Sequence, residues 1–335
     1  MQTNYRPRSL LARCFLSRCF GALALIAAAS GSLSAQEAWP NRPVKLIVPL
    51  TAGGGVDMMA RLTAQHLSDQ LGQQVVVENQ GGAGGTIAAN AVARARPDGY
   101  TLIFQSVSSA VVNALVYKNL PYDPIKDLIP VTLAGSFPLV LVTNPELPAK
   151  DLGELIALLK ANPGKYSYGS SGVGTLGHLA FELLKLRAGV DIVHIPYKGA
   201  APIVTDLLGN QIQLAVMSVT AAIPQTNAGK LRAIALSSPV QLSAVPDWRP
   251  LSDTLPGFDA SSRLFLIAPA GTPTAIVRKL NRALEQVLAE PEVLESFAKN
   301  GAPAAWSTPE ALATEMAEET QRWGSIARSS GAKLE

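Results

Sequence analysis

Cysteine and the usual catalytic signatures are scarce in this chain of 335 residues. Its two cysteines, Cys14 and Cys19, both precede a short apolar run near the N-terminus. If that segment is removed on export, the rest of the chain has no thiol for a disulfide bond or a nucleophile. The chain has three histidines but neither a His-Glu-x-x-His motif nor a Gly-x-Ser-x-Gly elbow. We therefore expect a binding protein rather than an enzyme, with no cofactor and no metal.

Long apolar runs are also missing, and the N-terminus is typical of an export signal. The apolar run at 20–29 is about half of the roughly 20 residues that span a bilayer. Small residues follow it, and four basic residues precede it: Arg6, Arg8, Arg13 and Arg18. We predict a signal peptide over residues 1–35, cleaved near Ser34 or Ala35, and a periplasmic location.

Charge is sparse and nearly balanced. The whole chain has 28 basic and 25 acidic residues, but four of the basic residues lie within 1–35. The remainder is therefore close to neutral, which gives no indication of a nucleic-acid or membrane-surface partner. A hydrophobic content of 48% with 16% charged residues indicates extensive burial rather than disorder. We expect a folded monomer.

Short apolar runs alternate with helical patterns over most of the chain. The runs predict strands at 44–48, 75–77, 102–104, 139–142, 192–195, 214–217, 231–236 and 265–268. The helical patterns lie at 57–70, 84–95, 151–161, 176–187, 199–208, 273–290 and 309–328. This alternation predicts an α/β fold with largely parallel sheets.

Two extended, proline-bearing stretches suggest two lobes. They lie at 135–138 and 255–260, between predicted strands. If both cross between lobes, residues 36–137 and 260–335 form a discontinuous first lobe and residues 138–259 form the second. Two crossings make a hinge, and the cleft between two lobes is a natural ligand site.

Glycine clusters stand where two predicted strands run into helices. Gly53–Gly55 follow the first strand, and Gly169–Gly174 follow an apolar segment at 166–168. Glycine allows tight turns and close approach of the main chain, and a helix start offers free N–H groups with partial positive charge. Together they favour a bound carboxylate or phosphate, although a purely structural tight turn remains the alternative.

Neither glycine cluster favours nucleotide binding. The first lacks the Gly-Lys-Ser/Thr ending of a phosphate loop. The second matches Gly-x-Gly-x-x-Gly, but no acidic residue ends the following strand, as a dinucleotide site requires. A pocket for a small anion is the better use of these glycines, and we expect Asp57 to cap the helix that follows the first cluster.

Further candidate ligand-binding residues follow other predicted strands. Ser106, Ser108 and Ser109 supply hydroxyl groups, although such residues often only cap helices. Tyr197, Lys198 and Gly199 occupy the equivalent place in the second lobe, where Lys198 is either a ligand-binding ammonium or a solvated surface group. His178 follows the second glycine cluster on a helix, so it either faces the cleft or packs in the interior.

The chain resembles the solute-binding (Bug, or TctC) proteins of tripartite tricarboxylate transporters. Matching segments run in order along the chain at 39–57, 76–85, 95–102, 168–172, 195–199, 229–233 and 268–273. The resemblance implies a type II periplasmic binding fold, in which two α/β lobes close on a small organic carboxylate. It also implies integral membrane permease subunits as partners.

Carried over position by position, the resemblance implies a ligand site made from both lobes. The first lobe would contribute Thr51, Ala52, Gly53, Gly54, Ser106, Ser108 and Ser109. The second would contribute Ser170, Ser171, Gly172, Thr175, Tyr197, Lys198, Gly199, Ser218 and Thr220. Arg263 stands where the family often has an aromatic residue, and the segment 217–220 lacks the Phe-Asp pair often found there. Arg263 could bind a second carboxylate as a fork or point into solvent.

Two other functions use the same features. An exported sensor lobe could present its closed form to a membrane signalling partner. An exported α/β enzyme could use a serine or histidine on an anionic substrate, but the sequence shows no base next to a nucleophile. We favour the transport receptor.

Overall fold

The computed structural model describes residues 1–2, 39–50, 52–53, 55–117, 119–197 and 200–330. The residues from Arg42 onward form one compact unit. Nearly all of the predicted signal peptide, with its cleavage site at Ser34 or Ala35, lies outside the described residues. Four predicted site residues also lie outside them: Thr51, Gly54, Lys198 and Gly199.

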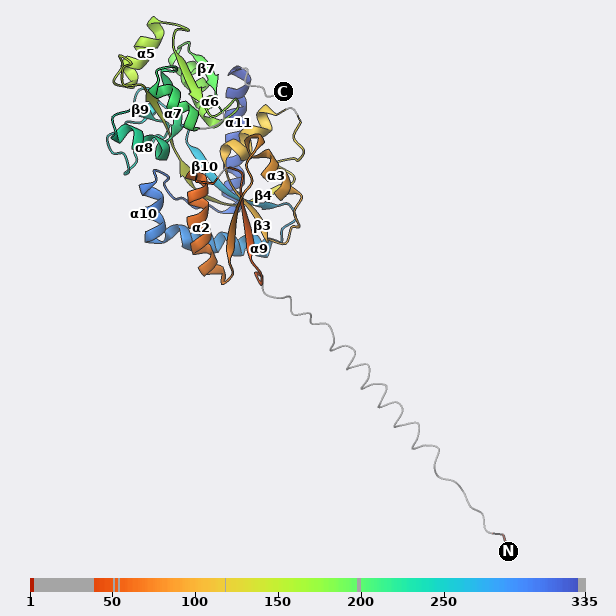
Figure 1. The fold of residues 1–335 in the computed structure, drawn as a ribbon. Coiled ribbons are helices and arrows are strands. Elements are labelled where there is room, and N and C mark those ends of the chain that lie inside the picture. Colours follow the sequence, from red (N-terminus) through yellow and green to blue (C-terminus); the bar gives the residue numbers. More distant parts are fainter. Residues whose placement is uncertain (3–38, 51, 54, 118, 198–199, 331–335) are drawn as a thin grey trace. The chain divides into compact units, whose positions relative to one another are not determined.

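The first lobe is built on a five-stranded sheet with the order β2-β1-β3-β10-β4, of which β3, β10 and β4 are labelled in Figure 1. Its strands are β1 (Val44–Val48), β2 (Val75–Asn79), β3 (Thr101–Ser106), β4 (Leu128–Phe137) and β10 (Ser262–Pro269). The first three are parallel, whereas β10 runs antiparallel to both β3 and β4. Four of the five residues of β1 are buried, so its sequence is mostly apolar rather than strictly alternating, and only Lys45 is exposed.

The second lobe repeats this arrangement in the order β7-β6-β8-β5-β9. Its strands are β5 (Leu139–Thr143), β6 (Ser167–Ser170), β7 (Val193–Pro196), β8 (Leu214–Ser218) and β9 (Arg232–Leu236). The first three in that order are parallel, and β5 runs antiparallel to β8 and β9. The two-lobed α/β fold is confirmed, but the prediction of largely parallel sheets is wrong because both sheets are mixed.

Helices cover the two sheets, and most lie where the sequence predicts them. Their bounds are α2 (Gly55–Leu71), α3 (Thr86–Ala93), α4 (Asn113–Val116), α5 (Leu152–Ala161), α6 (Leu176–Ala188), α7 (Ala200–Leu208), α8 (Val219–Asn227), α9 (Thr274–Ala289), α10 (Pro291–Lys299) and α11 (Pro309–Ser330). Short turns of other helix types are η1 (Ala83–Gly85), η2 (Ser108–Val112) and η3 (Leu251–Asp253). Among the described residues, no helix combines the length and apolar character needed to cross a membrane.

The chain crosses between the sheets twice, and the crossings lie side by side. It leaves the first sheet after Phe137, enters the second at Leu139 and returns to the first at Ser262. The Ser237 hydroxyl accepts a hydrogen bond from the Leu139 amide at 2.8 Å, and the Ser237 carbonyl accepts one from the Ala260 amide at 2.9 Å. The division into lobes at 137/138 and 259/260 stays a prediction that agrees with this path.

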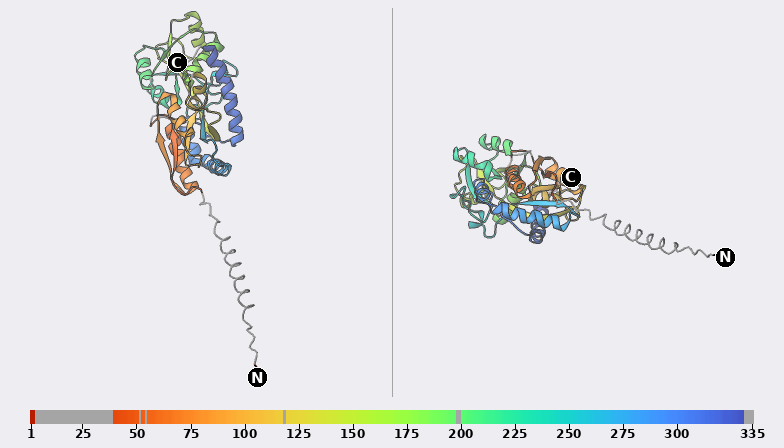
Figure 2. Two further views of the ribbon diagram at one scale, coloured as in Figure 1. Left: turned by 90° about the vertical axis from the view of Figure 1, so that its right-hand side faces the viewer. Right: turned by 90° about the horizontal axis from the view of Figure 1, so that it is seen from below.

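The C-terminal helix α11 ties the two lobes together. It contacts β4 in the first lobe and α6 in the second, and Figure 2 shows it (blue) lying along the side of the molecule. Its Trp323 is fully buried in a core cluster that also contains Phe265 of β10 and Leu141 of β5. The lobes therefore share apolar packing as well as two chain crossings.

Candidate functional site

The glycine-rich loop of the first lobe is held by a buried carboxylate. Asp57, in the first turn of α2, is 3% exposed and accepts hydrogen bonds from the Gly53 amide (2.8 Å) and Arg61 Nε (3.0 Å) on one oxygen. Its other oxygen accepts from Asn79 Nδ2 at 2.8 Å. Burial raises the pKa of Asp57, but the bonds from Arg61, Gly53 and Asn79 outweigh burial and lower it. Asp57 thus fixes the loop, while Ala52 and Gly53 are exposed.

Three loops of the first lobe meet at this end of the sheet. A Cβ atom on Gly85, just before α3, would lie 2.9 Å from Cβ of Ser109 and 3.0 Å from Cβ of Pro49. The Ser109 hydroxyl donates to the Ser106 carbonyl at 3.2 Å, so this predicted residue is engaged by its own loop. Ser108 begins η2, a π-helix, and such turns are frequent at functional sites. Only glycine at position 85 permits this loop to come so close to Pro49 and Ser109.

The second glycine-rich loop is fixed by hydroxyl groups. The Ser170 hydroxyl, fully buried, donates to the Gly172 carbonyl at 3.0 Å and lies 2.7 Å from His194 Nε2. The Thr175 hydroxyl also donates to the Gly172 carbonyl (2.8 Å) and caps α6 by accepting from the His178 amide (3.4 Å). Ser171 is exposed at the tip of the loop. Ser170 and Thr175 therefore shape the loop.

A stack of rings lies directly behind this loop. His178 and His194 stack with centroids 4.1 Å apart, and Tyr168 stacks on His194 at 4.8 Å. His178 is 6% exposed and its Nδ1 accepts from the Gly174 amide at 3.1 Å. Burial lowers the pKa of His178, and burial together with His178 and Lys185 lowers that of His194 to about 4. Both rings are neutral at pH 7 and pack in the interior of the second lobe. The placement of His178 therefore favours interior packing over direct ligand contact.

Tyr197 lies beside the same loop but its hydroxyl is occupied. It donates to Asp206 Oδ2 of α7 at 2.6 Å, and burial with this bond raises the pKa of Tyr197 to about 12. Its amide donates to the Ser170 carbonyl at 2.9 Å. The hydroxyl of Tyr197 is therefore engaged by Asp206, and a ligand contact from Tyr197 stays a prediction.

The start of α2 meets the start of α8 where the lobes come together. A Cβ atom on Gly55 would overlap the ring of Phe137 and lie 3.3 Å from the Thr220 hydroxyl oxygen. Ser218 caps α8 by accepting from the Ala221 amide at 3.3 Å. The Thr220 hydroxyl is buried without a hydrogen-bond partner among the described residues. Two positively polarised helix ends, one from each lobe, thus lie next to each other.

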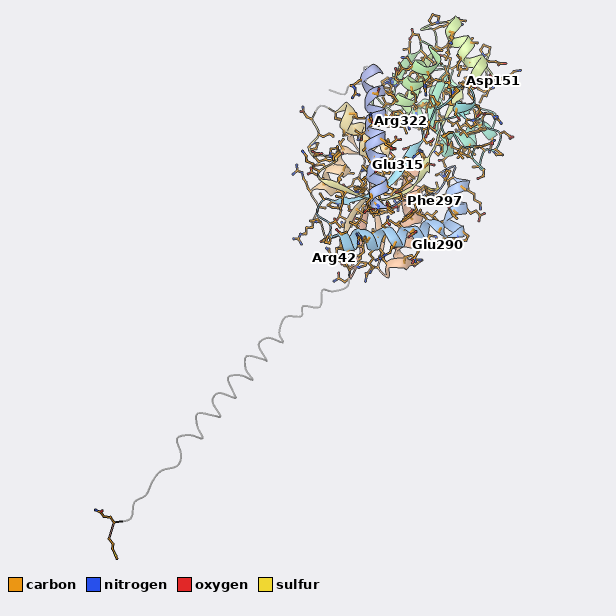
Figure 3. All side chains as sticks on the ribbon, turned by 180° about the vertical axis from the view of Figure 1, so that it is seen from behind. Arg42, Asp151, Glu290, Phe297, Glu315 and Arg322 are labelled. Atoms are coloured by element: carbon orange, nitrogen blue, oxygen red, sulfur yellow. The ribbon has the colours of Figure 1, made fainter. Side chains whose placement is uncertain are left out.

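Arg263 is bound within an ionic network at the hinge. Its Nε donates to Glu315 at 3.0 Å and its Nη2 donates to Asp259 at 3.2 Å. Glu315 and Arg322 lie on α11 (Figure 3), and Arg322 also binds the Asp259 carbonyl. Burial lowers the pKa of Arg263, but Asp259 and Glu315 outweigh it and raise the pKa. Arg263 thus ties the returning crossing to α11 rather than pointing freely into solvent, and a part for it in ligand binding stays a prediction.

Several residues that shape the site escaped the sequence analysis. Arg61 and Asn79 hold Asp57, and Asn113 donates to the Gly84 carbonyl at 2.6 Å. The glycines at 82–85 carried a signal that could have marked that loop as part of the site. Among the described residues, no group of His, Cys, Asp or Glu is arranged to hold a metal ion.

A mostly apolar hollow lies elsewhere in the described part of the chain. It encloses about 310 Å³ beside α11, and Val111, Ile125 and Met316 are among its lining residues. Thr320 is the single polar residue in that lining. This hollow lacks the donors that a carboxylate requires, so it is not the candidate site.

Known proteins resemble the chain over most of its length. The tripartite tricarboxylate transporter family receptor pattern matches residues 59–332. Protein BugT of Bordetella pertussis (strain Tohama I) is 41% identical over 302 residues, covering 89% of this chain and 92% of BugT. The solved structure of R. palustris Rpa4515 with adipate is 35% identical with a TM-score of 0.81, covering 88% of this chain and 100% of that one. MatC from Rhodopseudomonas palustris with bound malate is 32% identical with a TM-score of 0.75, covering 86% and 99%.

Proposed function

Because the chain belongs to the tripartite tricarboxylate transporter receptor family, we propose that it binds a small organic carboxylate in a cleft between its lobes. It then delivers the acid to integral membrane permease subunits. The receptor acts as a monomer in the periplasm after removal of a signal peptide near Ser34 or Ala35. The relatives with bound adipate and malate support an acid of this size as ligand.

The meeting of α2 and α8 carries this proposal. Gly55 begins one helix and Thr220 lies in the first turn of the other, and each helix start leaves N–H groups without intrahelical acceptors. An anion placed between them gains hydrogen bonds from both lobes only when the lobes are closed. The ligand therefore stabilises the closed form by its differential affinity for that form.

The expected affinity suits capture followed by release. A charge-assisted hydrogen bond contributes about 1.5–3 kcal/mol. Three or four such bonds, less the cost of association and closure, give about −8 kcal/mol, which corresponds to a dissociation constant of about 1 μM. No basic side chain is required for this affinity.

Calorimetric titration with adipate, malate and succinate, together with small-angle scattering, tests the proposal. We expect micromolar binding of at least one acid, compaction on binding, and no binding of the neutral diamides. Gly55→Ala should weaken binding by about 10-fold, because its methyl group displaces the Phe137 ring where the helices meet. Gly153→Ala, on α5, is the control and should leave affinity unchanged. Tight binding of the diamides, or binding without compaction, would contradict the proposal.

A further inference from the structure

A second buried hydroxyl group lies close to the meeting point of α2 and α8. Ser262, the first residue of β10, is 4% exposed, and its hydroxyl has no hydrogen-bond partner among the described residues. A buried hydroxyl without a partner is unfavourable, and most such groups in proteins are bound to protein, water or ligand. Ser262 therefore requires an explanation that the fold does not supply.

The strand register shows which way Ser262 points. Ser262 pairs with Phe137, and Leu264 pairs with Ser106. Directly paired residues and residues two apart on one strand point to the same face of a sheet. The Phe137 ring touches Gly55 of α2, so this is the face that α2 covers. Ser262 accordingly points to the face of the sheet that α2 covers, which is also the face of Ser106.

The neighbouring residue supports this assignment. Arg263 follows Ser262 on β10, so its side chain points to the opposite face. That face is covered by α11, to which Arg263 is bound through Glu315 at 3.0 Å. The alternation along β10 therefore separates a hinge network on one face from an unpartnered hydroxyl on the other.

We propose that Ser262 and Thr220 form a specificity-determining pair that binds the second polar group of the ligand. This inference rests on the proposed function, in which the first carboxylate is bound by main-chain N–H groups at the starts of α2 and α8. Ser262 comes from the first lobe and Thr220 from the second. The Thr220 hydroxyl oxygen lies 3.3 Å from a Cβ atom placed on Gly55, and Ser262 pairs with Phe137, whose ring touches Gly55. A ligand with a second carboxylate gives each hydroxyl an acceptor, whereas an acid with an apolar tail leaves both without partners.

The test compares acids of equal length with and without the second carboxylate. Calorimetric titration is carried out with adipate against hexanoate and with succinate against butyrate. The native protein should prefer the dicarboxylate in at least one pair by about 10-fold or more. Ser262→Ala and Thr220→Val should each reduce that preference by about 10-fold, by weakening the dicarboxylate alone.

Ser261→Ala is the matched control. Ser261 is also a buried serine whose hydroxyl has no partner among the described residues, but it precedes β10 by one residue. This variant should keep the native preference. Thermal unfolding of each variant shows whether it folds. If Ser262→Ala does not fold, Thr220→Val alone completes the test.

The remaining outcomes separate this inference from the proposed function. If the native protein binds none of these acids, the proposed function fails and this inference fails with it. If the native protein binds these acids without preferring a dicarboxylate, the inference alone is overturned. The same holds if both variants keep the preference, or if they weaken the binding of both acids equally. An equal loss of affinity for both acids would indicate that the two hydroxyls bind structural water rather than the ligand.

Discussion

The two lobes share one strand order but fix their glycine-rich loops with different chemistry. In the first lobe a buried carboxylate, Asp57, holds the Gly53 amide and is itself held by Arg61 and Asn79. In the second lobe neutral groups do the same work: the Ser170 and Thr175 hydroxyls bind the loop carbonyl, and stacked histidine rings lie behind them. The fold therefore specifies where a loop must be held but not which interaction holds it.

This difference makes the lobes sensitive to different conditions. A carboxylate with a lowered pKa keeps its charge in mildly acidic solution. A buried neutral histidine gains a proton when the chain unfolds at that pH, so mild acid favours unfolding. Each lobe can be weakened separately, which makes the comparison open to experiment.

Removing the Asp57 carboxylate should have the largest effect. Asp57→Ala deletes three hydrogen bonds and leaves the loop amide of Gly53 without its acceptor. We expect the free energy of unfolding to fall by about 3 kcal/mol and carboxylate affinity to fall by about 10-fold. Urea unfolding and calorimetric titration measure the two effects.

The control for Asp57 is an exposed ion pair with the same spacing on a helix. Glu295 and Lys299 are 2.7 Å apart, and both side chains are largely exposed. Glu295→Ala should change stability by less than about 0.5 kcal/mol and leave binding unchanged. If both variants lose the same stability, the first lobe does not depend on its buried carboxylate as we argue.

Mild acid should weaken the second lobe first. The pKa of folded His194 is about 4, below its ordinary value of 6.5, so the unfolded chain binds more protons between these values. Stability therefore falls as the pH falls from 6.5 to 4, and we expect a loss of about 2 kcal/mol. The stabilisation from Asp57 is lost only below its ordinary value of 3.8, because its folded pKa is lower still.

Urea unfolding at a series of pH values measures this loss. His194→Gln removes one of the titrating rings and should reduce the loss between pH 6.5 and 4 by about half. Asp57→Ala should keep the native pH dependence over the same range, although it is less stable throughout. A pH profile that His194→Gln leaves unchanged would show that the stacked rings do not set the acid sensitivity of the second lobe.

The sequence predicted elements well where the signal was local. The mostly apolar run at Val44–Val48 matches β1, and the predicted helix at 151–161 matches α5, which Asp151 caps by accepting from the Glu154 amide. β4 was missed because it is an edge strand that contains Pro130 and Gly135, and its burial follows no regular alternation. α8 was missed because it contains Pro224, which sequence rules treat as a helix breaker.

The site was predictable in its backbone but not in its side-chain partners. Glycine clusters indicate tight loops and can be seen in the sequence itself, so the loops near Gly53 and Gly172 were identified from local pattern. The partners of Arg263 were not, because Glu315 lies 52 residues further along the chain and only the packing of α11 brings it near. Such pairing depends on tertiary contacts, which a single sequence does not display.

Two fully buried threonines extend the comparison of the lobes at the smallest scale. In β4 of the first lobe, Thr132 donates to the Ser307 carbonyl at 2.8 Å, whereas in β5 of the second lobe the Thr143 hydroxyl has no partner among the described residues. Thr132→Val should destabilise the protein by about 1 kcal/mol because it removes this bond and takes away the acceptor of the Ser307 amide, which donates to Thr132 Oγ1 at 3.3 Å. Thr143→Val should instead stabilise it by about 0.5 kcal/mol, because valine has nearly the same shape and removes an unsatisfied group. Urea unfolding of the two variants measures both effects. A lower free energy of unfolding in both variants would mean that buried water satisfies Thr143, and that the second lobe is as fully hydrogen-bonded as the first.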